Sequence, residues 1–211
     1  MQEADQLRLV DALVFALRAH ADQMRKGTRV PYVSHLFQVA GLVLEAGGDT
    51  DQALAGLLHD SIEDCDEVDA AVLRARFGDE VTRIVEVCTD VEPGDRSDAK
   101  SDWGVRKTRY LERLEAADER ARLVAACDKL HNLRSLVADL RAHGAATLER
   151  FTARPEQTRW YYESAHARLR GALPDALRID FDVQLDALRG FVARAETPAA
   201  SGSRGRGGEP D

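Results

Sequence analysis

Apolar side chains recur every three or four positions along most of this chain, the spacing of one face of an α-helix. The pattern predicts amphipathic helices over residues 6–24, 35–46, 51–64, 67–77, 79–89, 118–142, 155–172 and 175–194, with a shorter one over 145–153 and another beginning near 103. No segment shows the strict alternation of a half-buried strand. The sequence therefore predicts an all-α fold.

Helix boundary signals divide these segments. Ser34 is a good N-cap for the second helix, and Asp49 can cap the third. Residues 91–104 are polar and rich in turn formers, so we expect a long loop there, in a place where a lid could lie. From residue 196 to 211 the chain is rich in Gly, Ser, Pro and Arg without periodicity. We expect one domain over 1–195 and a disordered tail over 196–211.

Composition narrows the function classes. The 211 residues are 44% hydrophobic and 31% charged, with a formal net charge of −8. A net negative charge argues against a general nucleic-acid binder, but leaves room for a small anionic ligand in a local basic pocket. No stretch reaches the roughly 20 apolar residues that span a bilayer. An acidic N-terminus without a signal-peptide pattern, and three cysteines without CxxC spacing, predict a reducing, cytoplasmic setting.

The candidate chemistry is concentrated at the end of the greasy third helix, where His59, Asp60, Glu63 and Asp64 follow one another. On a continuous helix, His59 would stack with Glu63, and Asp60 with Asp64. A solvated helix end is the plain interpretation of such a run. However, acids at a helix C-terminus oppose the helix dipole, so a compensating cation such as a metal ion is the alternative.

Two further residues could join that group. His35 lies in the first turn of the second helix, and Asp128 lies beside the apolar stripe of the long helix over 118–142. A lone histidine of this kind is usually structural. Asp128 could equally form a rim salt bridge with Arg120 or Arg122. The functional interpretation places both of them next to His59 and Asp60.

Basic residues are concentrated in a loop between the first two helices. Arg25, Lys26 and Arg29 surround Gly27 and precede Pro31, so the segment could cradle an anion or could be a solvated basic turn. The chain has four lysines, Lys26, Lys100, Lys107 and Lys129, and all of them fall near the segments discussed above.

Four segments, in order along the chain, resemble motifs of the HD superfamily of metal-dependent phosphohydrolases. Within that superfamily they are most similar to the small stand-alone alarmone hydrolases, which remove the 3′-pyrophosphate from (p)ppGpp. They are Arg25-Lys26 with Pro31-Tyr32-Val33-Ser34-His35, then Ala55 to Asp64, then Phe77-Gly78-Asp79-Glu80-Val81 with Val87-Cys88-Thr89, and finally Cys127-Asp128-Lys129-Leu130-His131-Asn132-Leu133-Arg134. The resemblance covers about residues 8–140 and implies a multi-helix bundle with a metal site between helices.

The resemblance also implies the roles of individual residues. His35, His59, Asp60 and Asp128 would hold one Mn²⁺ ion, and the same nitrogen and oxygen donors also suit Fe²⁺, Co²⁺ or Zn²⁺. Glu63 and Asp64 would orient or deprotonate the attacking water. The pyrophosphates of the substrate would be neutralised by Arg25, Lys26, Lys100, Lys107 and Arg134. Asn132 would contact the nucleotide or support the metal ligands, and Tyr161 would contact the 5′-phosphates or the sugar, although aromatics spaced like Tyr161 are usually core.

The implied activity is Mn²⁺-dependent hydrolysis of (p)ppGpp to GDP or GTP and pyrophosphate. Two alternatives stay open at this stage. The same chemistry could act on another nucleotide, such as ppApp, because a fold does not fix a substrate. A catalytically silent module that senses a nucleotide is the other. The expected partner is thus a small-molecule nucleotide, with no nucleic acid and no membrane, and the sequence leaves the oligomeric state undefined.

Overall fold

The computed structural model describes residues 1–90, 102–150 and 152–196, and helices account for nearly all of the regular structure in them. The elements in order are α1 (Glu3–Ala19), α2 (Val33–Glu45), α3 (Thr50–Leu58), α4 (Ser61–Asp64), α5 (Ala70–Phe77), α6 (Asp79–Cys88), α7 (Trp103–Ala116), α8 (Glu119–His143), the 3-10 helix η1 (Gly144–Arg150), α9 (Pro155–Leu169), the 3-10 helix η2 (Arg170–Ala172) and α10 (Asp175–Glu196). The all-α prediction is confirmed.

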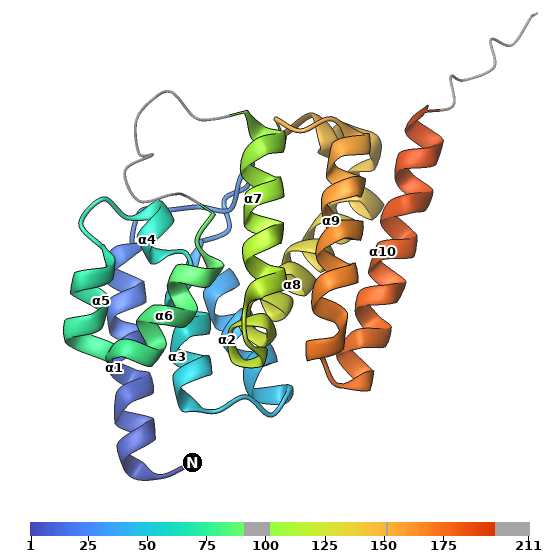
Figure 1. The fold of residues 1–211 in the computed structure, drawn as a ribbon. Helices are drawn as coiled ribbons and strands as arrows, with labels where there is room; N and C mark the ends of the chain where they lie inside the picture. Colours follow the sequence, from blue (N-terminus) through green and yellow to red (C-terminus); the bar gives the residue numbers. More distant parts are fainter. Residues whose placement is uncertain (91–101, 151, 197–211) are drawn as a thin grey trace, which may run out of the picture.

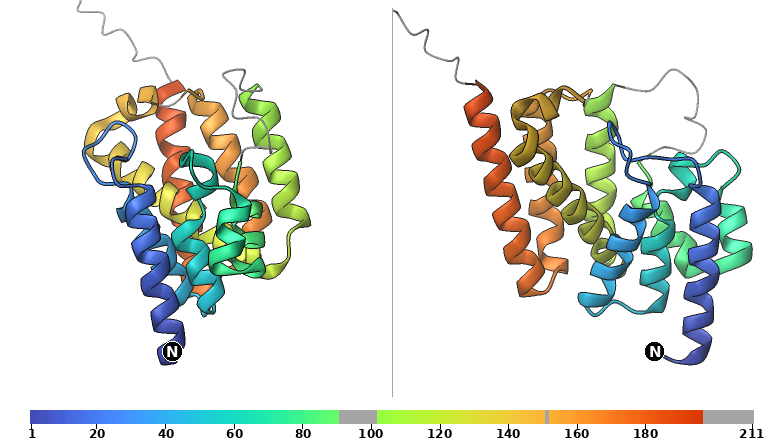
Figure 2. Two further views of the ribbon diagram at one scale, coloured as in Figure 1. Left: turned by 90° about the vertical axis from the view of Figure 1, so that its left-hand side faces the viewer. Right: turned by 180° about the vertical axis from the view of Figure 1, so that it is seen from behind.

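Helix α8 joins the two halves of the bundle (Figure 1). The half formed by α1 to α6 lies on one side of α8, and α7, α9 and α10 run side by side on the other. The view from behind shows α8 crossing obliquely between α2 and α10 (Figure 2). α8 packs against α2, α3, α6, α9 and α10, so residues on different faces of this helix meet both halves.

Helix ends follow local capping chemistry. Asp49 and Gln52 form a reciprocal capping box at the start of α3, as expected for an Asp at this position. Gly78 adopts a φ of 91° between α5 and α6, and Gly144 a φ of 70° after α8, conformations that L side chains rarely adopt. The prediction that Ser34 caps α2 is wrong, because α2 already begins at Val33 with Tyr32 at the cap position.

The predicted continuous helix over 51–64 is also wrong, because α3 ends at Leu58. Asp60, with φ −97° and ψ −3°, is the cap residue of a separate single turn, α4. His59 and Asp60 therefore occupy a bend, and their side chains are not restricted to the two helix faces that a straight helix would give them. His59 and Asp60 therefore do not stack on Glu63 and Asp64, as a straight helix would require, but converge toward α2 and α8.

The basic segment between α1 and α2 folds as a small hairpin. Tyr32 N donates to Gln23 O at 2.9 Å and Arg25 N donates to Val30 O at 2.8 Å. Gly27, with a φ of 71°, makes the turn at its tip. The loop predicted over 91–104 ends earlier than expected, because Asp102 caps α7 and Trp103 and Gly104 are already helical; residues 91–101 lie outside the described residues. The predicted tail over 196–211 also lies outside them, apart from Glu196, which ends α10.

The core is continuous across the bundle and contains all three cysteines, Cys65, Cys88 and Cys127, as free thiols. A close helix approach places Gly56 of α3 against α2, where a Cβ on Gly56 would lie 3.2 Å from Cα of Ala40. A side chain at this position would require α2 and α3 to move apart by a few tenths of an ångström, so the glycine suits their separation. Among the described helices, none is long and apolar enough to cross a bilayer.

Candidate metal centre

Two helices and one bend bring four predicted ligands together. His35 comes from α2, His59 and Asp60 from the bend after α3, and Asp128 from α8. Nε2 of His35 lies 3.2 Å from Oδ1 of Asp128 and 3.5 Å from Oδ2 of Asp60. Nε2 of His59 lies 3.4 Å and 2.9 Å from the same two oxygens. The four donor groups therefore surround one small volume, and three of them, His35, His59 and Asp128, have ligand atoms within 4.8 Å of one another.

Neighbouring side chains hold the two carboxylates in place. Tyr32 donates its hydroxyl to Oδ2 of Asp60 at 2.6 Å. Lys129 donates to Oδ2 of Asp128, and Asn132 donates from Nδ2 to Oδ1 of the same carboxylate, each at 2.6 Å. The rim salt bridge considered for Asp128 is not formed, because Arg120 pairs with Asp49 and Glu80 instead.

The charges of the cluster favour a cation. Burial by itself would raise the pKa of Asp60 and of Asp128, but Lys129 beside Asp128 and the histidines beside both hold these pKa values well below their usual range. The same carboxylates overcome the effect of burial on His59 and raise its pKa well above normal. Two ionised carboxylates thus draw positive charge onto an imidazole, and a divalent cation would supply that charge instead. Two imidazoles and two carboxylates without a thiolate fit such an ion.

Glu63 and Asp64 lie beside the cluster on α4 and are exposed. Backbone N of Asp90 donates to Oε2 of Glu63 at 3.1 Å. The protein atoms around the Glu63 carboxyl, and the charges of Asp60 and Asp90, raise its pKa. The surroundings of Asp64, with the charges of Asp60 and Glu63, raise its pKa to about 6. Both acids therefore hold protons more tightly than ordinary surface carboxyls, which suits proton transfer near neutral pH.

A pocket of about 470 Å³ opens next to the cluster, and both Arg25 and Lys26 line it. Arg25 donates from Nη2 to Oδ1 of Asn132 at 2.9 Å, which connects the hairpin to the carboxylate of Asp128 through one intervening amide. The wall also includes Tyr32, His131 and Tyr162. A cationic pocket that shares its wall with a metal-type cluster can hold an anionic substrate close to a hydrolytic centre.

Other predicted contacts are placed differently. Arg134 pairs with Asp180 of α10 and does not line this pocket. Tyr161 is buried, and Nζ of Lys107 lies 4.9 Å from the centre of its ring. Lys107 also pairs with Asp90, the residue whose backbone N donates to Glu63. Lys107 and Tyr161 therefore lie on the Glu63 side of the cluster and do not line the pocket. Lys100 lies outside the described residues.

The sequence alone assigns no role to Tyr32, Tyr162, His131 or Lys129. The run of aromatic residues Trp160-Tyr161-Tyr162 is visible in the sequence, but helical spacing does not show that Tyr162 rather than Tyr161 lines the pocket. Tyr32 and Lys129 contact Asp60 and Asp128 across bends and helix packing. Those contacts depend on tertiary structure, so sequence spacing could not identify them.

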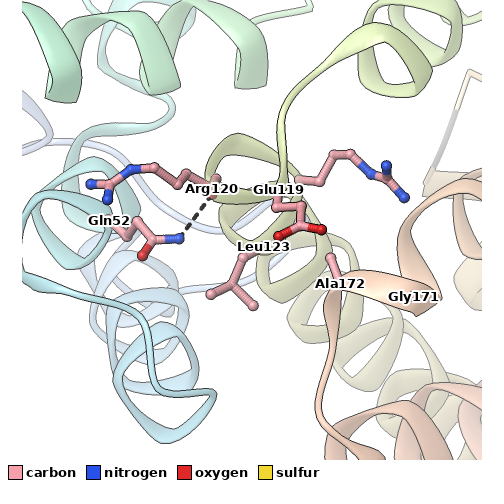
Figure 3. A pocket seen from close by; sticks show the side chains of 7 residues that line it. Gln52, Glu119, Arg120, Leu123, Gly171 and Ala172 are labelled. Atoms are coloured by element: carbon pink, nitrogen blue, oxygen red, sulfur yellow. Dashed lines mark hydrogen bonds between the residues drawn. The ribbon is translucent and has the colours of Figure 1, made fainter.

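A second pocket, of about 380 Å³, lies at the N-terminal end of α8 (Figure 3). Gln52 donates there from Nε2 to the carbonyl oxygen of Arg120 at 3.1 Å, and Glu119, Leu123 and Ala172 complete much of the wall. None of the site residues predicted from the sequence lines it. It is therefore separate from the centre described above.

Comparison with known proteins identifies the family. The sequence profile described as HD domain matches residues 12–153, more than half of the 211 residues. This chain belongs to the HD domain family. The matched segment includes all four residues of the cluster as well as Glu63 and Asp64.

Individual known proteins are similar to this chain over about 60% of its length. The guanosine-3′,5′-bis(diphosphate) 3′-pyrophosphohydrolase MESH1 of Xenopus tropicalis is 35% identical over 136 residues, which are 63% of this chain and 72% of that protein. A probable guanosine-3′,5′-bis(diphosphate) 3′-pyrophosphohydrolase of Synechocystis sp. is 36% identical over 127 residues, which are 60% of this chain and 16% of that protein. The match thus spans under a fifth of the Synechocystis protein but over two thirds of the Xenopus one.

Solved structures extend the likeness to the fold. The structure of a metazoan ortholog of SpoT, described as hydrolysing ppGpp, has a TM-score of 0.69 and 28% identity, covering 87% of this chain and 96% of that one. The structure of lmo0812 from Listeria monocytogenes EGD-e has a TM-score of 0.61 and 27% identity, covering 75% of this chain and 99% of that one. These values place the C-terminal helices as well as the HD region within the shared architecture.

Proposed function

We propose that this protein is a metal-dependent hydrolase that removes the 3′-pyrophosphate of guanosine 3′,5′-bis(diphosphate) and of its triphosphate analogue, giving GDP or GTP and pyrophosphate. The observation that carries the proposal is the convergence of His35, His59 and Asp128 on one volume, with Asp60 beside them. The MESH1 relatives, whose names state this activity, support the substrate.

In this proposal His35, His59, Asp60 and Asp128 hold one Mn²⁺ ion. When bound, such an ion supplies Lewis acidity toward a phosphoryl oxygen and toward water. The residues present also suit Fe²⁺, Co²⁺ or Zn²⁺, so metal preference is a matter for direct measurement.

The remaining steps belong to side chains. Glu63 takes the proton from the attacking water and Asp64 orients that water, since both carboxyls have raised pKa values beside the cluster. Arg25 and Lys26 neutralise substrate phosphates in the adjoining pocket and spread the negative charge that develops on the phosphoryl oxygens as water attacks phosphorus. The bond from that phosphorus to the 3′-oxygen breaks, and the 3′-oxygen takes up the proton that water gave to Glu63, which leaves a 3′-hydroxyl and pyrophosphate. Lys107, tied to Asp90, contributes positive charge behind Glu63. The unpaired, buried cysteines suit a reducing, cytoplasmic setting.

The first experiment is pyrophosphate release from ppGpp by the purified chain, with Mn²⁺ or with chelator. We expect turnover with Mn²⁺ and none after chelation. Glu63→Gln should keep Mn²⁺ binding, measured by calorimetry, and reduce kcat at least 100-fold, on the order of the loss of a general base. Glu67→Gln, an exposed acid three residues past α4, is the matched control and should behave as wild type.

Asp60→Ala should lose both Mn²⁺ binding and turnover, because it removes an ionised carboxylate from the cluster. Normal activity in Asp60→Ala would refute this centre. Tight ppGpp binding without turnover would instead identify a sensing module, and faster release from ppApp than from ppGpp would reassign the base preference.

A further inference from the structure

The imidazole of His131 lies against that of His35, inside the wall between the cluster and the pocket. The two Nδ1 atoms are 2.6 Å apart, and the ring centroids are 4.7 Å apart at 37°. Both side chains are buried, His35 on α2 and His131 on α8. His131 also lines the 470 Å³ pocket that Arg25 and Lys26 make cationic.

This contact can hold a single hydrogen. Two N–H groups cannot face one another at 2.6 Å, so one Nδ1 must donate and the other must accept. The positions of the hydrogens on the two rings are therefore linked. Whichever ring accepts at Nδ1 carries its own hydrogen on Nε2 if it is neutral.

His59 shows which arrangement the cluster requires. Its Nδ1 lies 2.9 Å from the carbonyl oxygen of Gly56, which can only accept, so Nδ1 of His59 carries a hydrogen and Nε2 is the nitrogen whose lone pair a metal ion would take. Nε2 of His35 lies 3.2 Å from Nε2 of His59 and faces the same carboxylate of Asp128. For His35 to present a lone pair to the same volume, its Nδ1 must donate to His131.

We propose that His131 is a positioning residue that accepts this hydrogen bond, fixes the ligating tautomer of His35, and thereby presents its own Nε2–H to an anionic oxygen of the substrate in the pocket. The inference rests on the proposed metal centre. Within the described part of the chain, Nε2 of His131 makes no side-chain or backbone hydrogen bond, so it is available to the pocket. Metal binding and substrate binding are then linked through one pair of rings.

The direct test is 15N NMR of protein labelled at histidine, first metal-free and then loaded with Zn²⁺, a diamagnetic ion. Long-range 1H–15N spectra distinguish a ring nitrogen that carries hydrogen from one that does not. With Zn²⁺ bound, we expect hydrogen on Nδ1 of His35 and on Nε2 of His131. Zn²⁺-induced shifts at Nε2 of both His35 and His59, combined with hydrogen on Nδ1 of His131, would overturn the inference and leave the metal centre intact.

Variants provide an independent readout. His131→Leu removes the acceptor, and we expect Zn²⁺ affinity to fall roughly 10- to 100-fold, the usual cost of losing the partner of a ligating histidine. His131→Asn places an amide oxygen near the former Nδ1 and should recover most of that affinity while KM for ppGpp stays raised. His143→Gln, an exposed histidine on the same helix, is the control. Equal Zn²⁺ affinity in His131→Leu and wild type would refute the positioning role, and absent Zn²⁺ shifts at His35 and His59 would refute the metal centre with it.

Discussion

Arg25 and Asn132 are 107 positions apart in the chain, yet Nη2 of Arg25 donates to Oδ1 of Asn132 at 2.9 Å. Nδ2 of Asn132 in turn donates a hydrogen bond to Asp128, so the contact with Arg25 joins the hairpin to the cluster. The guanidinium also lies 5.8 Å from the centre of the Tyr32 ring. Arg25 is thus oriented toward the pocket before any substrate arrives.

Arg25→Ala should raise KM for ppGpp at least 10-fold with a smaller change in kcat, because it removes from the pocket wall a guanidinium that is already oriented to bind phosphate. Steady-state kinetics of pyrophosphate release give both constants. Arg29→Ala, an exposed arginine of the same hairpin, is the matched control and should leave KM within a factor of about two. Equal effects of the two substitutions would point to general electrostatic attraction rather than to a fixed contact.

Arg134 provides the opposite case. Its guanidinium pairs with Asp180 across the interface between α8 and α10, so Arg134→Ala should lower the free energy of unfolding by no more than about 1 kcal/mol and leave KM unchanged. Chemical denaturation and steady-state kinetics measure the two effects. A KM increase matching that of Arg25→Ala would show that Arg134 turns toward substrate during the reaction, as the family resemblance implied.

A side chain at Gly56 should destabilise the packing of α3 against α2. Gly56→Ala places a Cβ 3.2 Å from Cα and 3.3 Å from N of Ala40, and we expect a loss of roughly 1–3 kcal/mol in the free energy of unfolding. Because the carbonyl oxygen of Gly56 faces Nδ1 of His59, metal affinity should fall as well. Gly41→Ala in α2 meets no atom within 4 Å and should instead stabilise by up to about 1 kcal/mol. Similar melting temperatures for both variants would contradict the close approach of α2 and α3.

The pKa of Asp64 predicts a pH effect on stability in chelator. The protein atoms packed around the Asp64 carboxyl and the charges of Asp60 and Glu63 raise this pKa from 3.8 to about 6, so the folded state binds the proton more tightly than the unfolded state. Ionisation therefore costs stability as pH rises through that range, and the cost is absent well below the unfolded pKa. Asp64→Asn should raise the melting temperature near pH 8 and have no effect near pH 3, whereas Asp22→Asn, an exposed control, should have none at either pH. A gain of equal size at both pH values would contradict the assignment.

The helices could be predicted from the sequence, because the apolar residues that form each buried helix face recur every three or four positions. Asp49 and Gly144 mark the ends of α3 and α8 through interactions within a few residues. The break after Leu58 is not predicted, because Ile62 follows Leu58 at helical spacing and no Gly or Pro lies between them. What ends the helix is the tertiary arrangement, in which His59 and Asp60 lie against α2 and α8.

The four predicted cluster residues come together in the structure, because residue type and order along the chain carry that information. Their supporting contacts do not follow from order. Tyr32 reaches Asp60 across 28 positions, and His131 reaches His35 across 96. Such contacts depend on helix crossing and side-chain direction, to which sequence periodicity gives no access.

The three buried thiols have a practical consequence for experiments on this molecule. Burial raises the pKa of Cys65 to about 11 and that of Cys127 to about 12, and it raises the pKa of Cys88 further still. Because alkylating reagents react with the thiolate, these native cysteines should be nearly inert toward maleimides in the folded state. A new cysteine at an exposed position of α1 or α10 should therefore take a single fluorophore or spin label in an otherwise wild-type background.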